Sequence, residues 1–323
     1  MKSITPAHSF TFSLTNMKWN KQGLIFAPEG ISWANNSALQ PTPLFIDKDT
    51  IRIYAGLRDN EGRSRVGFVD VSAADPKRIL RVSEKPALDL GAPGSFDENG
   101  VVPCAVVRHL DEIRLYYAGY QLGQKVRFYV FSGLAISRDG GDTFTRHLRV
   151  PVCDRTSEEL LFRVIHSIRP ENGIWRAWYG AGADYELSAT GYQLPRYNIR
   201  YMESTDGIDF KNSVGRVVLD CRENEQRIGR PFVLKNNGLY QMFFAAADRK
   251  TNYRLAYAES MDGLDWTRKD EEIGIDVSKS GWDSEMMSYP SVVETNAGET
   301  YLFYNGNNYG RDGFGYAVLD ASG

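Results

Sequence analysis

The chain has 323 residues, of which 42% are hydrophobic and 24% charged, a balance typical of a soluble globular protein with a large core. The net charge of −3 is too small to favour binding to nucleic acid or to a membrane surface. No apolar run is long enough for a transmembrane helix. The N-terminal segment lacks the continuous apolar stretch of a secretory signal, so we expect a cytoplasmic protein.

Composition also bounds the fold class and the chemistry of the cysteines. Eighteen Tyr and 16 Phe, with many Val and Gly, favour strands over helices. The three cysteines, Cys104, Cys153 and Cys221, are an odd number without a CxxC pair, which predicts buried thiols rather than disulfides or a zinc site. The sequence has no P-loop, GxGxxG, HExxH, EF-hand or GxSxG motif, so we expect no cofactor and no metal.

One hairpin pattern recurs along the chain. Each copy has an apolar strand, a turn containing Gly, Asn or Asp, and a second strand rich in aromatic residues. The first strands of the copies begin near residues 42, 101, 163, 230 and 289. A third strand is expected after each pair, at residues 65–69, 133–137, 199–204, 255–260 and 315–319.

Three copies continue into an Asp-Gly turn followed by an aromatic residue, which predicts a fourth strand, and four-stranded repeats of about 50–65 residues are typical of a β-propeller. The last copy stops near Asp320, and Lys18–Phe26 at the other terminus resembles the missing strand. The sequence therefore predicts one all-β domain over residues 1–323. We expect a five-bladed β-propeller of four-stranded antiparallel blades, closed by the N-terminal strand, with residues 1–17 as a peripheral extension. A pair of β-sandwiches is the alternative.

Carboxylates precede the first strand in four of the five copies. They are Asp97, Glu98, Glu158, Glu159, Glu225, Asp283 and Glu285. First strands line the channel of a propeller, so these acids are expected to converge on one cavity. Crowded carboxylates shift apart in pKa, and glycosyl transfer needs one acid and one base or nucleophile. Solvated loop acids and ion pairs are the alternative interpretation.

Basic and aromatic residues recur near the same positions. Arg163, His166 and Arg230 lie in first strands, where a buried arginine is costly unless it pairs with a carboxylate or an anion. Arg–Glu pairs and an anionic-substrate clamp are both open, as are a catalytic and a structural role for His166. The loops between second and third strands should rim the same face, and they add Arg58, Arg127, Asp184, Asp248, Arg254 and Arg311. Candidates for a sugar-stacking floor are Trp33, Tyr120, Tyr185, Tyr289 and Tyr309.

These patterns resemble the five-bladed propeller glycosidases. The resemblance rests on the strand-start acids, on the Ser-x-Asp-Gly-x-x-Trp segment ending at Trp266 and on the Tyr-Tyr-Ala-Gly-Tyr strand ending at Tyr120, and it covers about Trp19 to Asp320. The group includes the arabinanase and β-xylosidase family, the invertase family (glycoside hydrolase families 43 and 32) and the related family 130 mannoside phosphorylases.

The resemblance implies roles for individual residues. Asp97 or Glu98 matches the acid that orients substrate from blade two, and Glu158 or Glu159 matches the general acid of blade three. Residues 32–42 contain no acid, so the base or nucleophile of blade one is unmatched, and Glu285 is a reserve carboxylate. Phosphorylase-like members instead let phosphate attack, held by basic residues. That role would suit Arg163, His166 and Arg230.

The sequence therefore predicts a carbohydrate-active enzyme that cleaves or transfers a glycosyl unit: a glycoside hydrolase, phosphorylase or transglycosylase. The catalytic candidates are Glu98, Glu159, Glu285 and Asp97. The substrate-binding candidates are Arg58, Arg163, His166, Arg230, Asp184, Asp248 and Tyr289. The expected partner is a small-molecule or oligosaccharide substrate, neutral or anionic.

The alternative is a non-catalytic propeller that binds a glycan or a nucleotide sugar and has lost the acid of blade one. Two carboxyls about 5–10 Å apart across an open pocket would favour the enzyme. Central acids that are each locked to an arginine would favour the binding protein.

Overall fold

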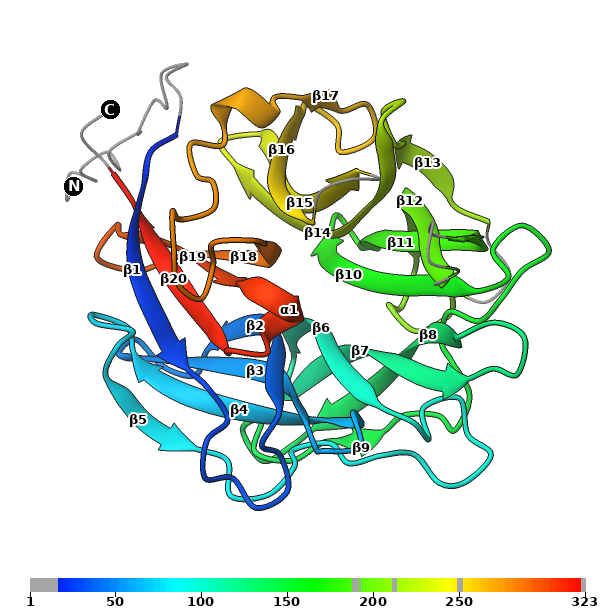
Figure 1. Cartoon of the computed structure of the whole chain (residues 1–323), viewed down its shortest axis with the longest axis horizontal. Helices are drawn as coiled ribbons and strands as arrows, with labels where there is room; N and C mark the ends of the chain where they lie inside the picture. The colour runs from blue at the N-terminus through cyan, green and yellow to red at the C-terminus, as the bar shows by residue number, and fades with distance from the viewer. Residues whose placement is uncertain (1–16, 188–190, 192, 211–213, 249–251, 321–323) are drawn as a thin grey trace, which may run out of the picture.

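The computed structural model describes residues 17–187, 191, 193–210, 214–248 and 252–320. Almost all regular structure in these residues is β-strand (Figure 1). Helix is limited to one 3-10 turn, Asp270–Glu272, and the short segment α1, Asn307–Gly310. The all-β prediction is thus confirmed, whereas the expected peripheral extension falls almost entirely outside the described residues.

The strands follow one another in antiparallel four-stranded units. Unit 1 is β2–β5, unit 2 is β6–β9, unit 3 is β10–β13, unit 4 is β14–β17, and unit 5 is β18–β20 with β1. Units 2 and 3 also join through a short parallel pairing of β8 with β10. The strand bounds are β1 Trp19–Phe26, β2 Ser37–Phe45, β3 Thr50–Arg58, β4 Ser64–Ser72, β5 Ile79–Val82, β6 Val101–His109, β7 Glu112–Leu122, β8 Phe128–Ser137, β9 Thr145–Arg146, β10 Phe162–Glu171, β11 Ile174–Leu187, β12 Gln193–Ser204, β13 Arg216–Leu219, β14 Glu225–Asn236, β15 Leu239–Asp248, β16 Arg254–Ser260, β17 Thr267–Arg268, β18 Ser288–Glu294, β19 Thr300–Asn305 and β20 Phe314–Leu319.

The Asp-Gly turns end the third strands as predicted, and unit 4 shows the local cause. The backbone N–H of Gly263 donates to the Ser260 hydroxyl at 2.8 Å, and the Asp262 carboxylate accepts from the next two backbone N–H groups. Gly263 has a φ of 77°, which favours glycine because it lacks a Cβ. The Trp178 indole of unit 3 donates to its carbonyl oxygen, so the same turn packs one unit against the next.

The hydrophobic core lies mainly between units rather than within one sheet. Trp178 and Ile199 of unit 3, for example, pack in one buried cluster with Met242 and Phe244 of unit 4. The first strands also contact one another in sequence: β2 contacts β6, β6 contacts β10, β10 contacts β14, β14 contacts β18 and β18 contacts β2. These contacts place the first strands around the middle of the molecule (Figure 1).

The N-terminal strand lies in the last unit, as predicted. Antiparallel pairing of β1 with β20 runs from Trp19 opposite Leu319 to Phe26 opposite Phe314. An ion pair strengthens the attachment: the Lys21 ammonium lies 2.7 Å from the Asp283 carboxylate, which is almost fully buried just before β18. Tyr304 donates to the same carboxylate at 3.0 Å.

We predict that Lys21→Met lowers the free energy of unfolding by about 2 kcal/mol, because it leaves the buried Asp283 carboxylate without its cation. The expected loss is below that for a fully buried pair, since Lys21 is 24% exposed. Urea denaturation measures the change. Lys48→Met is the matched control: Lys48 is 80% exposed and should change stability little. A Lys21→Met variant as stable as the control would contradict the attachment.

The effect should also depend on pH. Burial alone would raise the pKa of Asp283, but hydrogen bonds and the charge of Lys21 outweigh burial and hold that pKa below its usual value. A carboxyl whose pKa is lowered on folding adds stability above its unfolded pKa and loses it as pH falls. The difference between wild type and Lys21→Met should therefore be constant between about pH 5 and 8 and should narrow below about pH 4.

Candidate functional site

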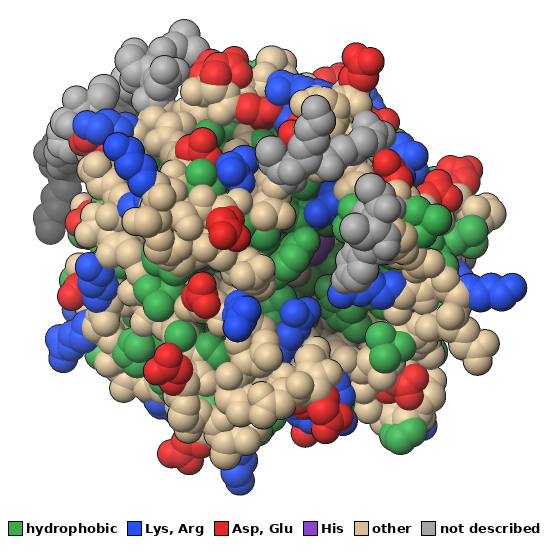
Figure 2. Space-filling model, viewed as in Figure 1, with side chains coloured by type: hydrophobic (Ala, Val, Ile, Leu, Met, Phe, Trp, Pro, Cys, Tyr) green, Lys and Arg blue, Asp and Glu red, His purple; other side chains and the backbone are tan. Residues whose placement is uncertain are grey.

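A cavity of about 280 Å³ lies among the five units and is lined by residues from each of them. Figure 2 shows the hollow near the middle of one face, with basic and hydrophobic side chains around it. The described lining residues are Gln40, Arg58, Ala118, Tyr120, Arg127, Phe128, Val130, Phe162, Val164, His166, Gly180, Leu194, Pro195, Tyr197, Arg227, Gly229, Arg230, Ala245, Tyr253, Tyr289 and Tyr309. Most polar side chains of the lining are tyrosines and arginines. None of the described lining residues is an Asp or a Glu.

Each first strand has a β-bulge, and in four of the five units the bulge contains a residue that lines this cavity. The register between first and second strands breaks between Leu39 and Thr42, and equivalent breaks occur in the other four units. A bulge places extra residues opposite its partner strand and re-aims their side chains. The residues within the breaks include Gln40, His166, Arg230 and Tyr289, which all line the cavity.

Three of these residues have strained backbones. Gln40, Arg230 and Tyr289 have φ values of 54°, 57° and 56°, and each is followed by proline. The left-handed region costs a residue with a Cβ about 1–3 kcal/mol, and such strain clusters at functional sites. The same backbone strain recurs at the bulge in three units. This recurrence indicates that the placement of these three side chains at the cavity has a functional role.

Arg230 lines the cavity and is 3% exposed. Its guanidinium donates to the backbone oxygen of Cys104, to the Thr42 hydroxyl at 3.0 Å and to the Ser291 hydroxyl at 3.4 Å. All three acceptors are neutral, and the Arg230 Nε has no hydrogen-bond partner. Burial lowers the pKa of Arg230 to about 10, so the side chain stays charged at neutral pH without a counter-charge.

Two further arginines in the cavity share this property. Arg227 is 6% exposed and donates from Nε to the Tyr253 hydroxyl at 2.8 Å, while one Nη group donates to Gln226. The Nε of Arg58 is buried without a hydrogen-bond partner. Neither Arg58 nor Arg227 forms an ion pair with a described residue. The cavity therefore holds three positive charges that no described carboxylate neutralises.

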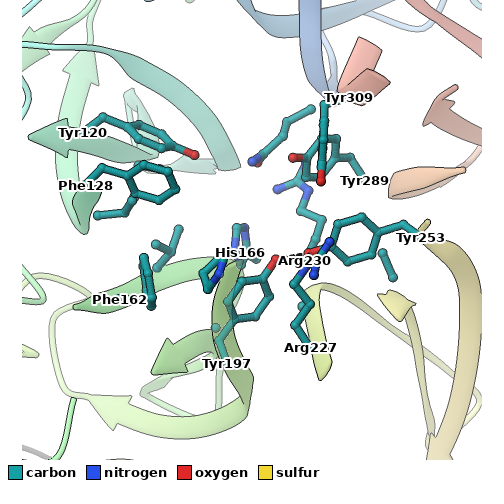
Figure 3. Close-up of a pocket in the computed structure, with 18 of the residues that line it drawn as sticks. Tyr120, Phe128, Phe162, His166, Tyr197, Arg227, Arg230, Tyr253, Tyr289 and Tyr309 are labelled. Carbon is teal, nitrogen blue, oxygen red and sulfur yellow. Dashed lines mark hydrogen bonds between the residues drawn. The ribbon is translucent and has the colours of Figure 1, made fainter. Parts of the chain in front are cut away.

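His166 projects from β10 into the same space (Figure 3). Burial and the neighbouring Arg230 charge lower its pKa well below the usual value, so the imidazole is neutral at pH 7. Its Nδ1 is buried and has no hydrogen-bond partner in the described chain. A neutral imidazole beside an arginine has one nitrogen that donates and one that accepts, so it can form either kind of hydrogen bond with a bound ligand.

Aromatic rings form the side of the cavity that faces Arg227 and Tyr253 (Figure 3). Tyr120 and Phe128 pack edge-to-face at 5.5 Å, and Phe128 contacts Phe162 at 6.0 Å. Figure 3 shows these three rings across the cavity from Arg227 and Tyr253. Val130 and Val164 also line the cavity and pack in one hydrophobic cluster with these rings. We call Tyr120, Phe128, Phe162, Val130 and Val164 the aromatic wall.

The substrate-binding candidates are only partly brought together. Arg58, His166, Arg230 and Tyr289 line the cavity, but Arg163, Asp184 and Asp248 do not. Arg163 is fully buried and lies 2.6 Å from Glu159. Of the proposed stacking aromatics, Tyr120, Tyr289 and Tyr309 line the cavity, whereas Trp33 and Tyr185 do not. The binding roles stay predictions.

The four catalytic candidates do not line this cavity, contrary to the convergence expected from their strand-start positions. Asp97 is fully buried, pairs with Arg146 of β9 at 2.7 Å and accepts from Tyr117 at 2.9 Å. Glu98 accepts the backbone N–H of Gly94, and Glu285 is exposed. Whether any of the four is catalytic stays a prediction.

Glu159 is held as tightly as Asp97. It is fully buried, lies 2.6 Å from Arg163 and 3.2 Å from Arg200, and accepts from Tyr179 at 2.5 Å. Glu225 and Asp283 pair likewise with Arg268 and Lys21. Acids recur before the first strands, and the sequence suggested that they share a chemical role. In the structure, four of these acids each form an ion pair, so their recurrence also has a structural role. We call Asp97, Glu159, Glu225 and Asp283 the strand-start carboxylates.

Sequence reasoning missed several cavity residues, although a signal for some of them was present. Gln40 was missed, but like the predicted residues Arg230 and Tyr289 it precedes a proline in what otherwise reads as a first strand. A proline inside a strand marks a bulge or an edge, so these dipeptides could have located the inward-facing residues. Arg227, Tyr197 and Tyr253 carried no comparable signal.

Thiols and metal ligands add no second site in the described residues. Cys104 and Cys153 are buried free thiols and Cys221 is a partly buried one, as predicted. No group of three or more His, Cys, Asp or Glu side chains in the described ranges is placed to hold a metal ion. None of the helices in those ranges is long and apolar enough to span a membrane.

Comparison with solved structures identifies the fold class. A glycosyl hydrolase from Bacteroides ovatus superposes with a TM-score of 0.69 at 14% identity, covering 96% of this chain and 95% of that protein. A thermostable family-43 glycoside hydrolase gives 0.64 at 16% identity, covering 91% of each. A structure of the GH130 family of mannoside phosphorylases, which contains glycoside hydrolases that target β-1,2 mannosidic linkages in Candida mannan, gives 0.69 at 14% identity and covers 100% and 98%. The chain therefore has the fold of the propeller glycosidases, as the resemblance implied.

Sequence comparison identifies the family. No protein-family model matches the chain. The uncharacterized protein Rv1502 of Mycobacterium tuberculosis (strain ATCC 25618 / H37Rv) is 36% identical over 306 residues, which are 94% of this chain and 100% of that protein. The uncharacterized protein MT1551 of strain CDC 1551 / Oshkosh matches equally well. The chain belongs to the same family as these two proteins.

We predict that Glu159→Gln destabilises the protein by about 3 kcal/mol, because it leaves the fully buried Arg163 charge without its partner. If Glu159 were instead the general acid that the resemblance implies, the substitution would lower turnover and leave the fold intact. Urea denaturation distinguishes the two expectations. The control is Glu158→Gln, one residue away on an exposed side chain, which should be neutral. If both variants match wild type, Glu159 is not a structural partner.

Proposed function

We propose that this protein is a carbohydrate-binding propeller whose cavity binds an anionic sugar or sugar ester. The observation that carries the proposal is the charge of the described lining: Arg58, Arg227 and Arg230 form no ion pair there, and no carboxylate joins them. Buried charges are costly unless they are paired. An anionic ligand would supply the missing counter-charge, and the low-dielectric surroundings would strengthen its attraction.

The hydrogen-bonding groups support an anionic rather than a neutral sugar. Arginine only donates, and the remaining polar side chains of the described lining are tyrosines, one glutamine and one histidine. Sugar hydroxyls donate as well as accept, so a neutral sugar would bury donors with few acceptors. Phosphate and carboxylate oxygens accept only. The fold shared with glycoside hydrolases and phosphorylases is what favours a carbohydrate as the ligand class.

The ion pairs formed by the acids that precede the first strands favour ligand binding over catalysis by these carboxylates. Asp97 and Glu159 are each locked to arginine, the arrangement expected of the non-catalytic alternative. Glycosyl transfer is the second candidate, and the fold similarity to glycoside hydrolases supports it. In that case Glu98 and Glu285, which form no ion pair with a described residue, are the carboxylates to test.

We also propose that the five units close into a single five-bladed propeller domain. The contacts from each first strand to the next, including β18 to β2, support closure, as does the pairing of β1 with β20. The cavity of about 280 Å³ suits a small ligand or the end of an oligosaccharide. A cytoplasmic location stays a prediction.

Binding can be tested with glucose 6-phosphate, glucuronate and glucose by titration calorimetry. We expect the two anions to bind and glucose not to bind detectably. Arg58→Met and Arg227→Met should each weaken binding about tenfold or more, the value of a charge-assisted hydrogen bond. Arg78→Met, the same change on an exposed residue outside the cavity, is the control. Glucose binding as tightly as the anions would refute the proposal.

Catalysis is tested separately with chromogenic glycosides and oligosaccharides, with and without inorganic phosphate. Under the binding proposal no sugar is released. Release that is lost in Glu98→Gln or Glu285→Gln, with melting temperature unchanged, would establish the second candidate instead. Phosphate-dependent release would indicate that the arginines hold the attacking anion.

A further inference from the structure

The charge in the cavity exceeds what a single carboxylate can neutralise. Arg58, Arg227 and Arg230 carry three positive charges, and two of the three side chains are more than nine-tenths buried. A glucuronate-type ligand with one negative charge would leave two of them uncompensated. A diphosphate carries two to three negative charges at neutral pH, and arginine binds phosphate oxygens with a fixed fork of donors.

Donors for such a group are available on more than one strand. The Nε groups of Arg58 and Arg230 are both buried without a hydrogen-bond partner in the described chain. Arg227 uses Nε and one Nη in its own hydrogen bonds, which leaves its other Nη group for a ligand. Arg58 lines the same cavity as Tyr120 and Tyr289. These donors all belong to residues that line one cavity, so several of them are available to one bound anion.

The aromatic wall requires a different kind of group. Among its five residues only Tyr120 has a side chain that can form a hydrogen bond. Phe128 and Phe162 belong to one hydrophobic cluster with Val130 and Val164. A sugar ring placed there would lose hydrogen bonds to its hydroxyls, whereas a flat aromatic ring would bury its apolar face against these rings.

Phe128 and Phe162 face Arg227 and Tyr253 across the cavity, with His166 and Arg230 between them (Figure 3). We infer that the ligand is a diphosphate ester that also carries an aromatic ring, the chemistry of a nucleoside diphosphate. The diphosphate lies at Arg58, Arg227 and Arg230. The ring packs against Phe128 and Tyr120, and it lies flat on only one of them because their planes are 62° apart. This inference rests on the proposed anion-binding function and narrows its ligand class.

The test compares uridine diphosphate, adenosine diphosphate, inorganic pyrophosphate, uridine and glucuronate by titration calorimetry with the full-length protein. We expect at least one nucleoside diphosphate to bind tenfold or more tightly than pyrophosphate, uridine or glucuronate. Stacking on aromatic residues accounts for roughly 5- to 100-fold in affinity per base.

Variants separate the two halves of the ligand. Phe128→Ala and Tyr120→Leu should weaken nucleoside diphosphate binding by about 5- to 100-fold and leave pyrophosphate binding unchanged. Arg227→Met should weaken both. Leu122→Ala, on the same strand as Tyr120 but 64% exposed and outside the cavity, is the control. Melting temperatures of all variants show whether each still folds, and two wall variants guard against one of them failing to fold.

Each remaining outcome decides between the inference and the proposed function. Equal binding of pyrophosphate and nucleoside diphosphates, unaffected by Phe128→Ala and Tyr120→Leu, would overturn the aromatic part and leave anion binding standing. Glucuronate binding most tightly would overturn the diphosphate. Absence of binding by every anion, including glucose 6-phosphate, would overturn both this inference and the proposed function.

Discussion

One buried guanidinium ties the first strands together. Arg230 of β14 donates to Cys104 of β6, to Thr42 of β2 and to Ser291 of β18, so a single side chain connects four units across the middle of the molecule. Its charge faces only neutral acceptors. Hydrophobic packing can often replace buried charge without loss of stability, so a buried charge with only neutral partners suggests a use beyond the scaffold. The same residue therefore belongs to both the architecture and the candidate site.

The site depends on interruptions of regular pairing. An uninterrupted strand would alternate its side chains between the two faces of the sheet, and no more than every second residue could approach the axis. The bulges change that alternation at the same level in all five units and turn Gln40, His166, Arg230 and Tyr289 inward. The backbone strain at three of these positions costs free energy. The hydrogen-bonded strand pairing that resumes directly after each bulge offsets this cost.

The fold was largely predictable because its signals are local: turn residues, aromatic second strands and Asp-Gly turns repeat within short windows. The predicted starts of the first strands were wrong where a bulge interrupts the alternation of apolar and polar residues along the strand. The first strands of units 1 and 4 were expected to begin at Thr42 and Arg230 but begin at Ser37 and Glu225, on the far side of the bulge. The candidate site was harder, since the direction of an acid depends on distant partners. Asp97 turns toward Arg146 of its own outer strand, and nothing near Asp97 in the chain indicates this.

The pairing of β1 with β20 also has a consequence for how the chain folds. Trp19 can pair with Leu319 only after the four intervening units have been synthesised. Contacts this distant in sequence are slow to form because a long loop must close first. Until then, the apolar residues of β1 and the edge of β20 have no partner, and unpaired strand edges promote association between chains. The chain should therefore be most vulnerable to aggregation late in folding, when four units are formed and the fifth waits for its outer strand.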